Sequence, residues 1–193
     1  MLLATWKNSS AFEGLARAKA DALKAVELDP TYAEAYAALG AVNFWLEWDW
    51  AAADANIRQA LALNPSNPNT RLLYADFLVS QSQIEMAASH IRQAVQLDPV
   101  SLLTNGLSAY AYLHAGLCDE AIAQANRMLE LEPKSPAAHE CLISAYQYKG
   151  TYKEARDIML EQMIERGAKP EAIDGLRQGD AKEAINRWKR RKD

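Results

Sequence analysis

The chain has little cysteine, no long apolar run and no excess of basic charge, and each absence excludes a class of protein. Two cysteines in 193 residues, Cys118 and Cys141, cannot build the framework of a disulfide-rich secreted domain, so a reducing compartment is expected. The start, MLLATWKNSS, has no basic segment ahead of an apolar one and is not a signal peptide. No apolar run approaches the roughly 18–20 residues that span a bilayer, so no membrane segment is expected and the cytoplasm is the expected location. The net charge of −4 does not favour phosphate binding, so nucleic acid is not expected as a partner.

Catalytic and metal-binding motifs are also missing from the sequence. The three histidines, His90, His114 and His139, fall in different predicted helices. H-E-x-x-H, C-x-x-C, the P-loop and G-x-G-x-x-G do not occur. His139 and Cys141 are two residues apart, so on a helix they point in different directions and do not share a metal. The sequence therefore predicts a protein that is not an enzyme and needs no metal or cofactor.

The chain does contain one sequence segment that is repeated four times. Each copy has small or apolar residues at helical spacing and closes with leucine, an acidic residue or asparagine, and proline. The closing prolines lie 35, 34 and 34 residues apart, and a fixed period of this size is typical of stacked-repeat proteins. The four copies are ARAKADALKAVELDP (16–30), ADANIRQALALNP (53–65), AASHIRQAVQLDP (87–99) and AIAQANRMLELEP (121–133).

A second amphipathic stretch follows each closing proline. Proline ends the preceding helix, and Thr31, Ser101 and Ser135 stand where helix N-caps are expected. Gly116 and Gly150 are placed to end two of these stretches in a left-handed conformation. Both kinds of segment are therefore predicted to be helices, joined by short turns into antiparallel pairs.

The best repeat resembles the tetratricopeptide repeat (TPR), and the match covers these residues: Tyr36, Leu39, Gly40, Ala53, Ile57, Ala60 and Pro65. The resemblance implies an all-α fold, a right-handed α-solenoid of stacked antiparallel helix pairs, with about four full repeats. The expected boundaries are a partial first repeat at 1–30, full repeats at 31–66, 67–100, 101–134 and 135–168, and a capping helix pair at 169–193. The partial repeat would keep the end of a first helix, Leu2–Trp6, and a second helix from about Glu13, so the start looks cut from a longer chain. In the cap, Asp180 is expected to begin the last helix.

The repeated small residues predict close helix packing, because a larger side chain there overpacks the interface. Ala121→Leu is accordingly expected to destabilise the chain, whereas Gln124→Leu, assigned to the outer face, is not. The second repeat has one extra residue within WLEWDWAAA (45–53), which predicts a longer turn. Trp45, Trp48 and Trp50 there are assigned to core packing around that turn, in preference to a ligand site.

In TPR proteins the first helix of each pair lines the concave side, and this resemblance implies a partner-binding groove. Its inner surface would be apolar with aromatic anchors, which suits a peptide or a partner helix. For any one groove residue, packing against neighbouring helices is an equal alternative to ligand contact. The predicted groove residues are Phe44, Trp45, Leu72, Asp76, Leu107, Tyr110, His114, Glu140, Ser144 and Tyr148.

The leading functional hypothesis is a non-catalytic scaffold that binds a protein or peptide in this groove. The phrases EWDWAAADANIRQALALNP, LDPVSLLTN and YKGTYKEA also resemble the TPR region attached to bacterial winged-helix regulators, serine/threonine kinases or nucleotide cyclases. That resemblance implies a sensing or assembly region of a larger signalling protein. Self-association into a homo-oligomer is a third hypothesis. The basic tail Lys189–Lys192 could touch nucleic acid or anionic lipid, but four charges at a terminus are more typical of a solubilising end.

Overall fold

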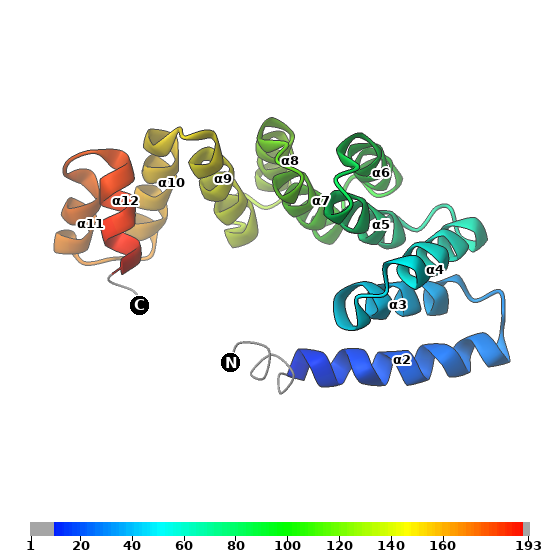
Figure 1. Cartoon of the computed structure of the whole chain (residues 1–193). Coiled ribbons are helices and arrows are strands. Elements are labelled where there is room, and N and C mark those ends of the chain that lie inside the picture. Colours follow the sequence, from blue (N-terminus) through cyan, green and yellow to red (C-terminus); the bar gives the residue numbers. More distant parts are fainter. Residues whose placement is uncertain (1–9, 191–193) are drawn as a thin grey trace. The chain divides into compact units, whose positions relative to one another are not determined.

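The computed structural model describes residues 10–190, and within that range every regular element is a helix (Figure 1). The chain divides into two compact units, unit 1 at Met1–Pro99 and unit 2 at Val100–Asp193. Consecutive helices pack against each other in pairs within each unit, as the sequence predicts. The fold is an all-helical solenoid of helix pairs. Among the described residues, no helix has both the length and the apolar composition needed to cross a bilayer.

Unit 1 is built around the pairs α3–α4 and α5–α6, with α2 packed on α3. Small residues of the second helix in each pair are completely buried, as Ala53 and Ala60 are in α4 and Ala87 and Ala94 are in α6. The helix axes can approach closely at these positions because the side chains end at Cβ. The described elements are α2 (Ser10–Leu28), α3 (Ala33–Val42), a π-helical turn η1 (Asn43–Glu47), α4 (Trp50–Leu63), α5 (Pro68–Ser80) and α6 (Ile84–Leu97).

Unit 2 continues the pattern with the pairs α7–α8 and α9–α10, followed by two shorter helices. Gly116 and Gly150 take φ values of 74° and 79°, so both end their helices in the left-handed conformation that the sequence predicts. The described elements are α7 (Leu102–His114), α8 (Cys118–Leu131), α9 (Pro136–Lys149), α10 (Tyr152–Glu165), α11 (Pro170–Arg177) and α12 (Ala181–Arg190).

Two of the three predicted N-cap residues occupy the N-cap position, and one of these two makes the capping hydrogen bond. Ser101 accepts a hydrogen bond from the N–H of Thr104 at 3.1 Å and caps α7. Ser135 occupies the N-cap position of α9 without such a bond. Thr31 instead donates its hydroxyl to Asp29 at 2.7 Å, so its prediction as a cap was wrong. A short hydroxyl side chain can satisfy the preceding turn as readily as the following helix.

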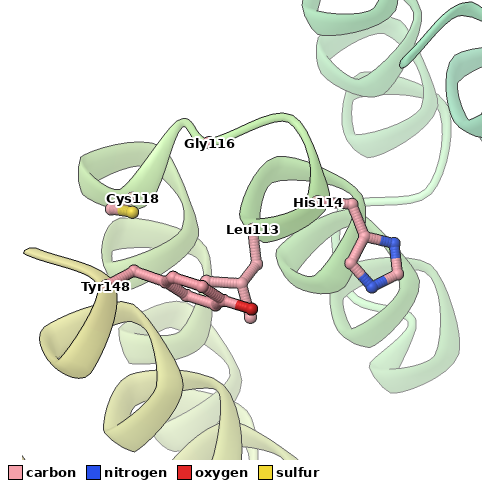
Figure 2. A pocket seen from close by; sticks show the side chains of 5 residues that line it. All are labelled: Leu113, His114, Gly116, Cys118 and Tyr148. Carbon is pink, nitrogen blue, oxygen red and sulfur yellow. The ribbon is translucent and has the colours of Figure 1, made fainter. Parts of the chain in front are cut away.

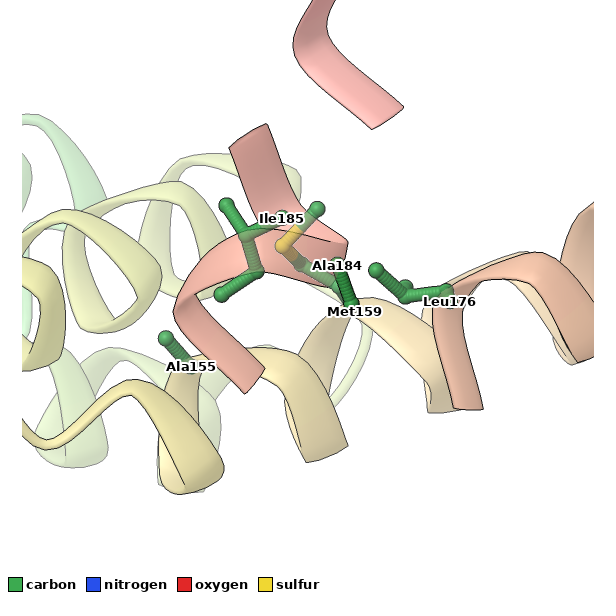
Figure 3. Packing of buried hydrophobic residues seen from close by; sticks show 5 residues of the cluster. All are labelled: Ala155, Met159, Leu176, Ala184 and Ile185. Carbon is green, nitrogen blue, oxygen red and sulfur yellow. The ribbon is translucent and has the colours of Figure 1, made fainter. Parts of the chain in front are cut away.

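The C-terminal helices close a hydrophobic cluster with α10 (Figure 3). Asp180 accepts the N–H groups of Lys182 and Glu183 at 2.9 and 3.2 Å, so it starts α12 as predicted. The side chains of the cluster point toward one another from three helices, and each is at most 5% exposed. Its buried members are Ala155, Met159, Leu176, Ala184 and Ile185.

Two further sequence predictions differ from the structure. Gln124 is not on the outer face: it is 6% exposed, and its Nε2 donates to the Oδ1 of Asn105, which is itself fully buried. A polar side chain can be buried when another helix supplies its hydrogen-bond partner. Helix α2 begins at Ser10, three residues before the expected start at Glu13. The predicted first helix, Leu2–Trp6, lies outside the described residues.

The extra residue of the second repeat lies in the last turn of the first helix and not in the longer connecting turn that the sequence predicts. After α3 the backbone widens into the π-helical turn η1, whose hydrogen bonds span one more residue than those of an α-helix. The turn ends at Trp48, whose φ of 60° and ψ of 25° place it in the left-handed region. Such a conformation is unusual for a bulky residue and costs on the order of 1–3 kcal/mol. The N–H of Trp48 donates to the carbonyl of Asn43, as does the N–H of Asp49 at 3.0 Å.

Candidate functional site

Helix α7 of unit 2 carries an exposed apolar stripe. Leu103 and Leu107 are one helical turn apart, and 62% and 43% of their surfaces are exposed. Residues four apart lie on the same side of a helix, so the two leucines form one continuous strip. Leu107 was a predicted groove residue and is exposed, as contact with a partner requires.

Helix α9 presents a second row of predicted groove residues, and a side-chain hydrogen bond joins it to α7. The hydroxyl of Tyr110 lies 3.5 Å from the Oε2 of Glu140, which links the two helices. Burial of the ring, followed by the nearby Glu140 carboxylate, raises the pKa of the Tyr110 hydroxyl, which therefore stays a neutral donor. Ser144, one turn after Glu140, is half-buried. These two helices therefore present apolar surface together with a carboxylate acceptor.

A hollow of about 560 Å³ lies at the end of α7 in unit 2. Figure 2 shows Tyr148 reaching from α9 toward Leu113 of α7, with Cys118 at the start of α8 beside it. His114 lies on the other side of Leu113, with its ring directed away from Tyr148. Tyr148 is 76% exposed, so its ring is available for contact with another molecule. The hollow thus brings together two predicted groove residues, His114 and Tyr148, and adds Cys118, which the sequence reasoning did not assign to the site.

The two cysteines of unit 2 are expected to react differently with thiol reagents. Cys141 is fully buried, with its Sγ 4.0 Å from the carbonyl of Ala121. Burial, together with the nearby Cys118, raises the pKa of the Cys141 thiol to about 11, so almost no thiolate forms at pH 8. We expect one equivalent of a chromogenic disulfide reagent to react with the native protein, at Cys118, and a second only in denaturant. Release of two equivalents from the native protein would contradict this, and Cys118→Ser should remove the native reaction.

In unit 1 the predicted groove residues separate into buried and exposed ones. Phe44 and Leu72 are only 8% and 5% exposed, so they are packing residues and not surface anchors. Trp45 is 43% exposed, and its Nε1 donates to the Oδ2 of Asp76 at 3.3 Å. Phe44 and Leu72 therefore follow the alternative that the sequence left open, which is packing instead of ligand contact. Trp45 and Asp76 form a polar contact between η1 and α5.

The assignment of the tryptophans to core packing was wrong. The buried aromatic residues at this place are Phe44 and Phe77, whose ring centroids are 5.7 Å apart. Trp45, Trp48 and Trp50 surround them with 43%, 63% and 39% of their surfaces exposed. Sequence spacing could not separate the two groups, because the exposure of Trp48 depends on its left-handed backbone.

Within residues 10–190, no group of three or more His, Cys, Asp or Glu side chains is placed to hold a metal ion. The arrangement on both units is instead one of exposed apolar and aromatic side chains with single carboxylates beside them. Such surfaces bind other molecules through buried area and a few hydrogen bonds.

The chain matches no protein-family model and no curated protein. It is similar to solved structures of tetratricopeptide-repeat proteins. YrrB, described as a TPR protein with an unusual peptide-binding site, is 26% identical over 81% of this chain and 79% of its own, with a TM-score of 0.57. PilF of Pseudomonas aeruginosa is 26% identical over 86% of this chain and 74% of its own, with a TM-score of 0.62. TTC0263, a thermophilic TPR protein of Thermus thermophilus, is 19% identical over 91% of this chain and 92% of its own, with a TM-score of 0.64. The fold predicted from the repeats is thereby confirmed.

Proposed function

We propose that this chain is a non-catalytic protein-interaction scaffold that binds a peptide segment or a partner helix on the face formed by α7 and α9. The single observation that carries the proposal is the exposed apolar surface of this face: Leu103 and Leu107 along α7, and Tyr148 of α9 in the hollow at the end of α7. Exposed apolar side chains that adjoin one another are typical of interaction sites. The likeness to YrrB, described as having a peptide-binding site, supports a peptide as the ligand class.

The chemistry of this face indicates how such a segment would be held. An apolar side chain of the ligand could enter the hollow and cover the ring of Tyr148, which carries much contact area with few rotatable bonds. Leu103 and Leu107 would receive further apolar side chains along α7. Glu140, which is exposed, would accept a hydrogen bond from the ligand and fix its position.

A peptide library displayed on phage tests this proposal with a matched pair of leucines. Leu107 and Leu131 are equally exposed, at 43% and 44%, but Leu131 lies at the end of α8, outside the proposed face. We expect peptides selected on the wild-type chain to bind Leu107→Ala and Tyr148→Ala at least tenfold more weakly. Leu131→Ala should bind them as the wild type does. Circular dichroism spectra identical to that of the wild type would show that all three variants keep their helices.

Failure to select any peptide, or equal loss in Leu107→Ala and Leu131→Ala, would contradict the assignment of this face. Labelling Cys118 with a bulky maleimide tests the role of the hollow independently, because the adduct would occupy it. Retained peptide affinity after that labelling would exclude the hollow from the site.

Attachment to a regulatory, kinase or cyclase domain stays a prediction from the sequence. The reading frame upstream of Met1 tests it directly. Self-association also stays a prediction, and light scattering over a concentration series would measure it. Both are compatible with a scaffold that binds a peptide on unit 2.

A further inference from the structure

Unit 1 carries a second exposed surface that the proposed peptide-binding face does not use. We define the tryptophan surface as Trp45, Trp48 and Trp50 lying over the buried rings of Phe44 and Phe77. These rings contact one another in a single cluster. The ring centroid of Phe44 lies 5.7 Å from those of Trp45 and Trp50, and the centroids of Trp50 and Trp48 are 5.9 Å apart. Three indoles within six residues, each more than a third exposed, form an aromatic surface that packing within the chain does not account for.

The backbone presents Trp48 to solvent by an unusual conformation. Its φ of 60° is a left-handed value that glycine or asparagine would adopt more easily, and the preceding turn is π-helical. Trp48 is the most exposed of the three indoles, so burial of its ring contributes little in return. A bulky residue held in this conformation at the surface indicates a role in contact with another molecule.

The charge beside the indoles selects the kind of molecule. Asp49 lies between Trp48 and Trp50 in the sequence, and these two rings meet nearly at right angles, with an interplanar angle of 81°. Its Oδ1 accepts the N–H of Ala52 at 3.0 Å, and within the described residues Asp49 has no basic partner. Indole faces attract cations, and a neighbouring carboxylate strengthens that attraction. A second carboxylate, Asp76, is held against Trp45.

We propose that the tryptophan surface binds a basic peptide segment, with arginine or lysine side chains of the partner received against the indoles of Trp48 and Trp50 beside Asp49. A second copy of this chain fits the surface less well, because a symmetric pairing would bring the carboxylate of Asp49 toward its own equivalent. An anionic membrane surface is disfavoured by the same carboxylate. This site is separate from the α7–α9 face and does not depend on the function proposed for it.

The substitutions that test the proposal preserve the fold. Trp48→Gly removes the indole and relieves the left-handed backbone, so we expect an unfolding midpoint equal to or above that of the wild type. Asp49→Asn keeps the cap of α4, because asparagine is as good an N-cap as aspartate, and removes only the charge. Trp48→Asn, which also tolerates a left-handed backbone, replaces the glycine variant if the latter loses helicity.

The measurement is an NMR titration of the indole N–H signals in the full 193-residue chain. The probe is the peptide acetyl-Gly-Arg-Pro-Arg-Gly-amide, and the control peptide carries neutral citrulline in place of each arginine. We expect saturable shifts of the Trp45, Trp48 and Trp50 signals with the arginine peptide and at least fivefold weaker binding of the citrulline peptide. Trp48→Gly and Asp49→Asn should each weaken arginine-peptide binding at least fivefold. Tyr148→Ala, in unit 2, should leave it unchanged.

Several results would overturn the proposal. Equal affinity for the two peptides would show that the surface does not select for positive charge. Unchanged binding by Trp48→Gly would exclude the indole, and absence of saturable shifts up to about 10 mM peptide would exclude the site. Indole shifts that appear on concentrating the protein without peptide would show that a second copy occupies the surface instead.

Discussion

Replacing Ala121 by leucine is expected to lower the free energy of unfolding by about 3 kcal/mol. Ala121 is completely buried in α8, and the Sγ of Cys141 in α9 lies 4.0 Å from its carbonyl oxygen. Three additional carbon atoms would have to separate the two helices or force neighbouring side chains out of their preferred rotamers. Urea unfolding followed by circular dichroism measures the loss, and the melting temperature should fall by about 6–12 °C.

The same substitution on the exposed side of the same helix is the control. Ala123 is exposed, so Ala123→Leu should change the free energy of unfolding by less than about 0.5 kcal/mol. Equal losses for Ala121→Leu and Ala123→Leu would show that α8 does not face α9 as described.

Gln124→Leu, which the sequence suggested as harmless, is not a neutral control. Leucine cannot donate to the Oδ1 of Asn105, and the loss of a buried hydrogen bond costs about 0.5–1.5 kcal/mol. The new apolar side chain offsets part of this, so we expect a net loss of about 1 kcal/mol.

The repeat register could be predicted from the sequence because it rests on a property that each residue carries by itself. An alanine ends at Cβ wherever it stands, so a 34-residue recurrence of alanines identifies the packed side of each second helix. Ala53, Ala87, Ala121 and Ala155 are indeed all completely buried. Likewise Gly116 and Gly150 are conformationally free at any position, and both end helices as predicted.

Gln124 and the tryptophans could not be placed in this way, because their environment is set by distant residues. Gln124 is buried only because α7 supplies Asn105 as its partner. Phe44 is buried and Trp45 exposed, although they are adjacent in the chain, because Phe77 of α5 packs on the first. The predicted groove residues are therefore a mixture: those of α7 and α9 reach the surface, while Phe44 and Leu72 stabilise unit 1.

Gly40→Ala is expected to destabilise the chain by about 2 kcal/mol, although alanine is the better helix former. A Cβ at Gly40 would lie 2.5 Å from the Cγ1 of Ile57 and 3.3 Å from its backbone nitrogen. Ile57 is completely buried in α4, and the Cγ1 of its β-branched side chain cannot shift as the end of a flexible chain can. Overpacking therefore exceeds the gain in helix propensity, which is about 1 kcal/mol. Urea unfolding followed by tryptophan fluorescence measures the change next to Trp45, Trp48 and Trp50.

Gly106→Ala is the matched substitution and should have the opposite sign. Gly106 lies in the middle of α7 and is buried, but a Cβ there would meet only the terminal methyl of Met128, at 3.4 Å. An unbranched methionine side chain can shift by the small distance required. The helix-propensity gain then prevails, and we expect stabilisation of up to about 1 kcal/mol. If both variants were stabilised, Gly40 would not lie as close to Ile57 as the structure places it. If both were destabilised, α7 and α8 would pack at Gly106 as tightly as α3 and α4 pack at Gly40, and Met128 would not be able to move aside for the added methyl group.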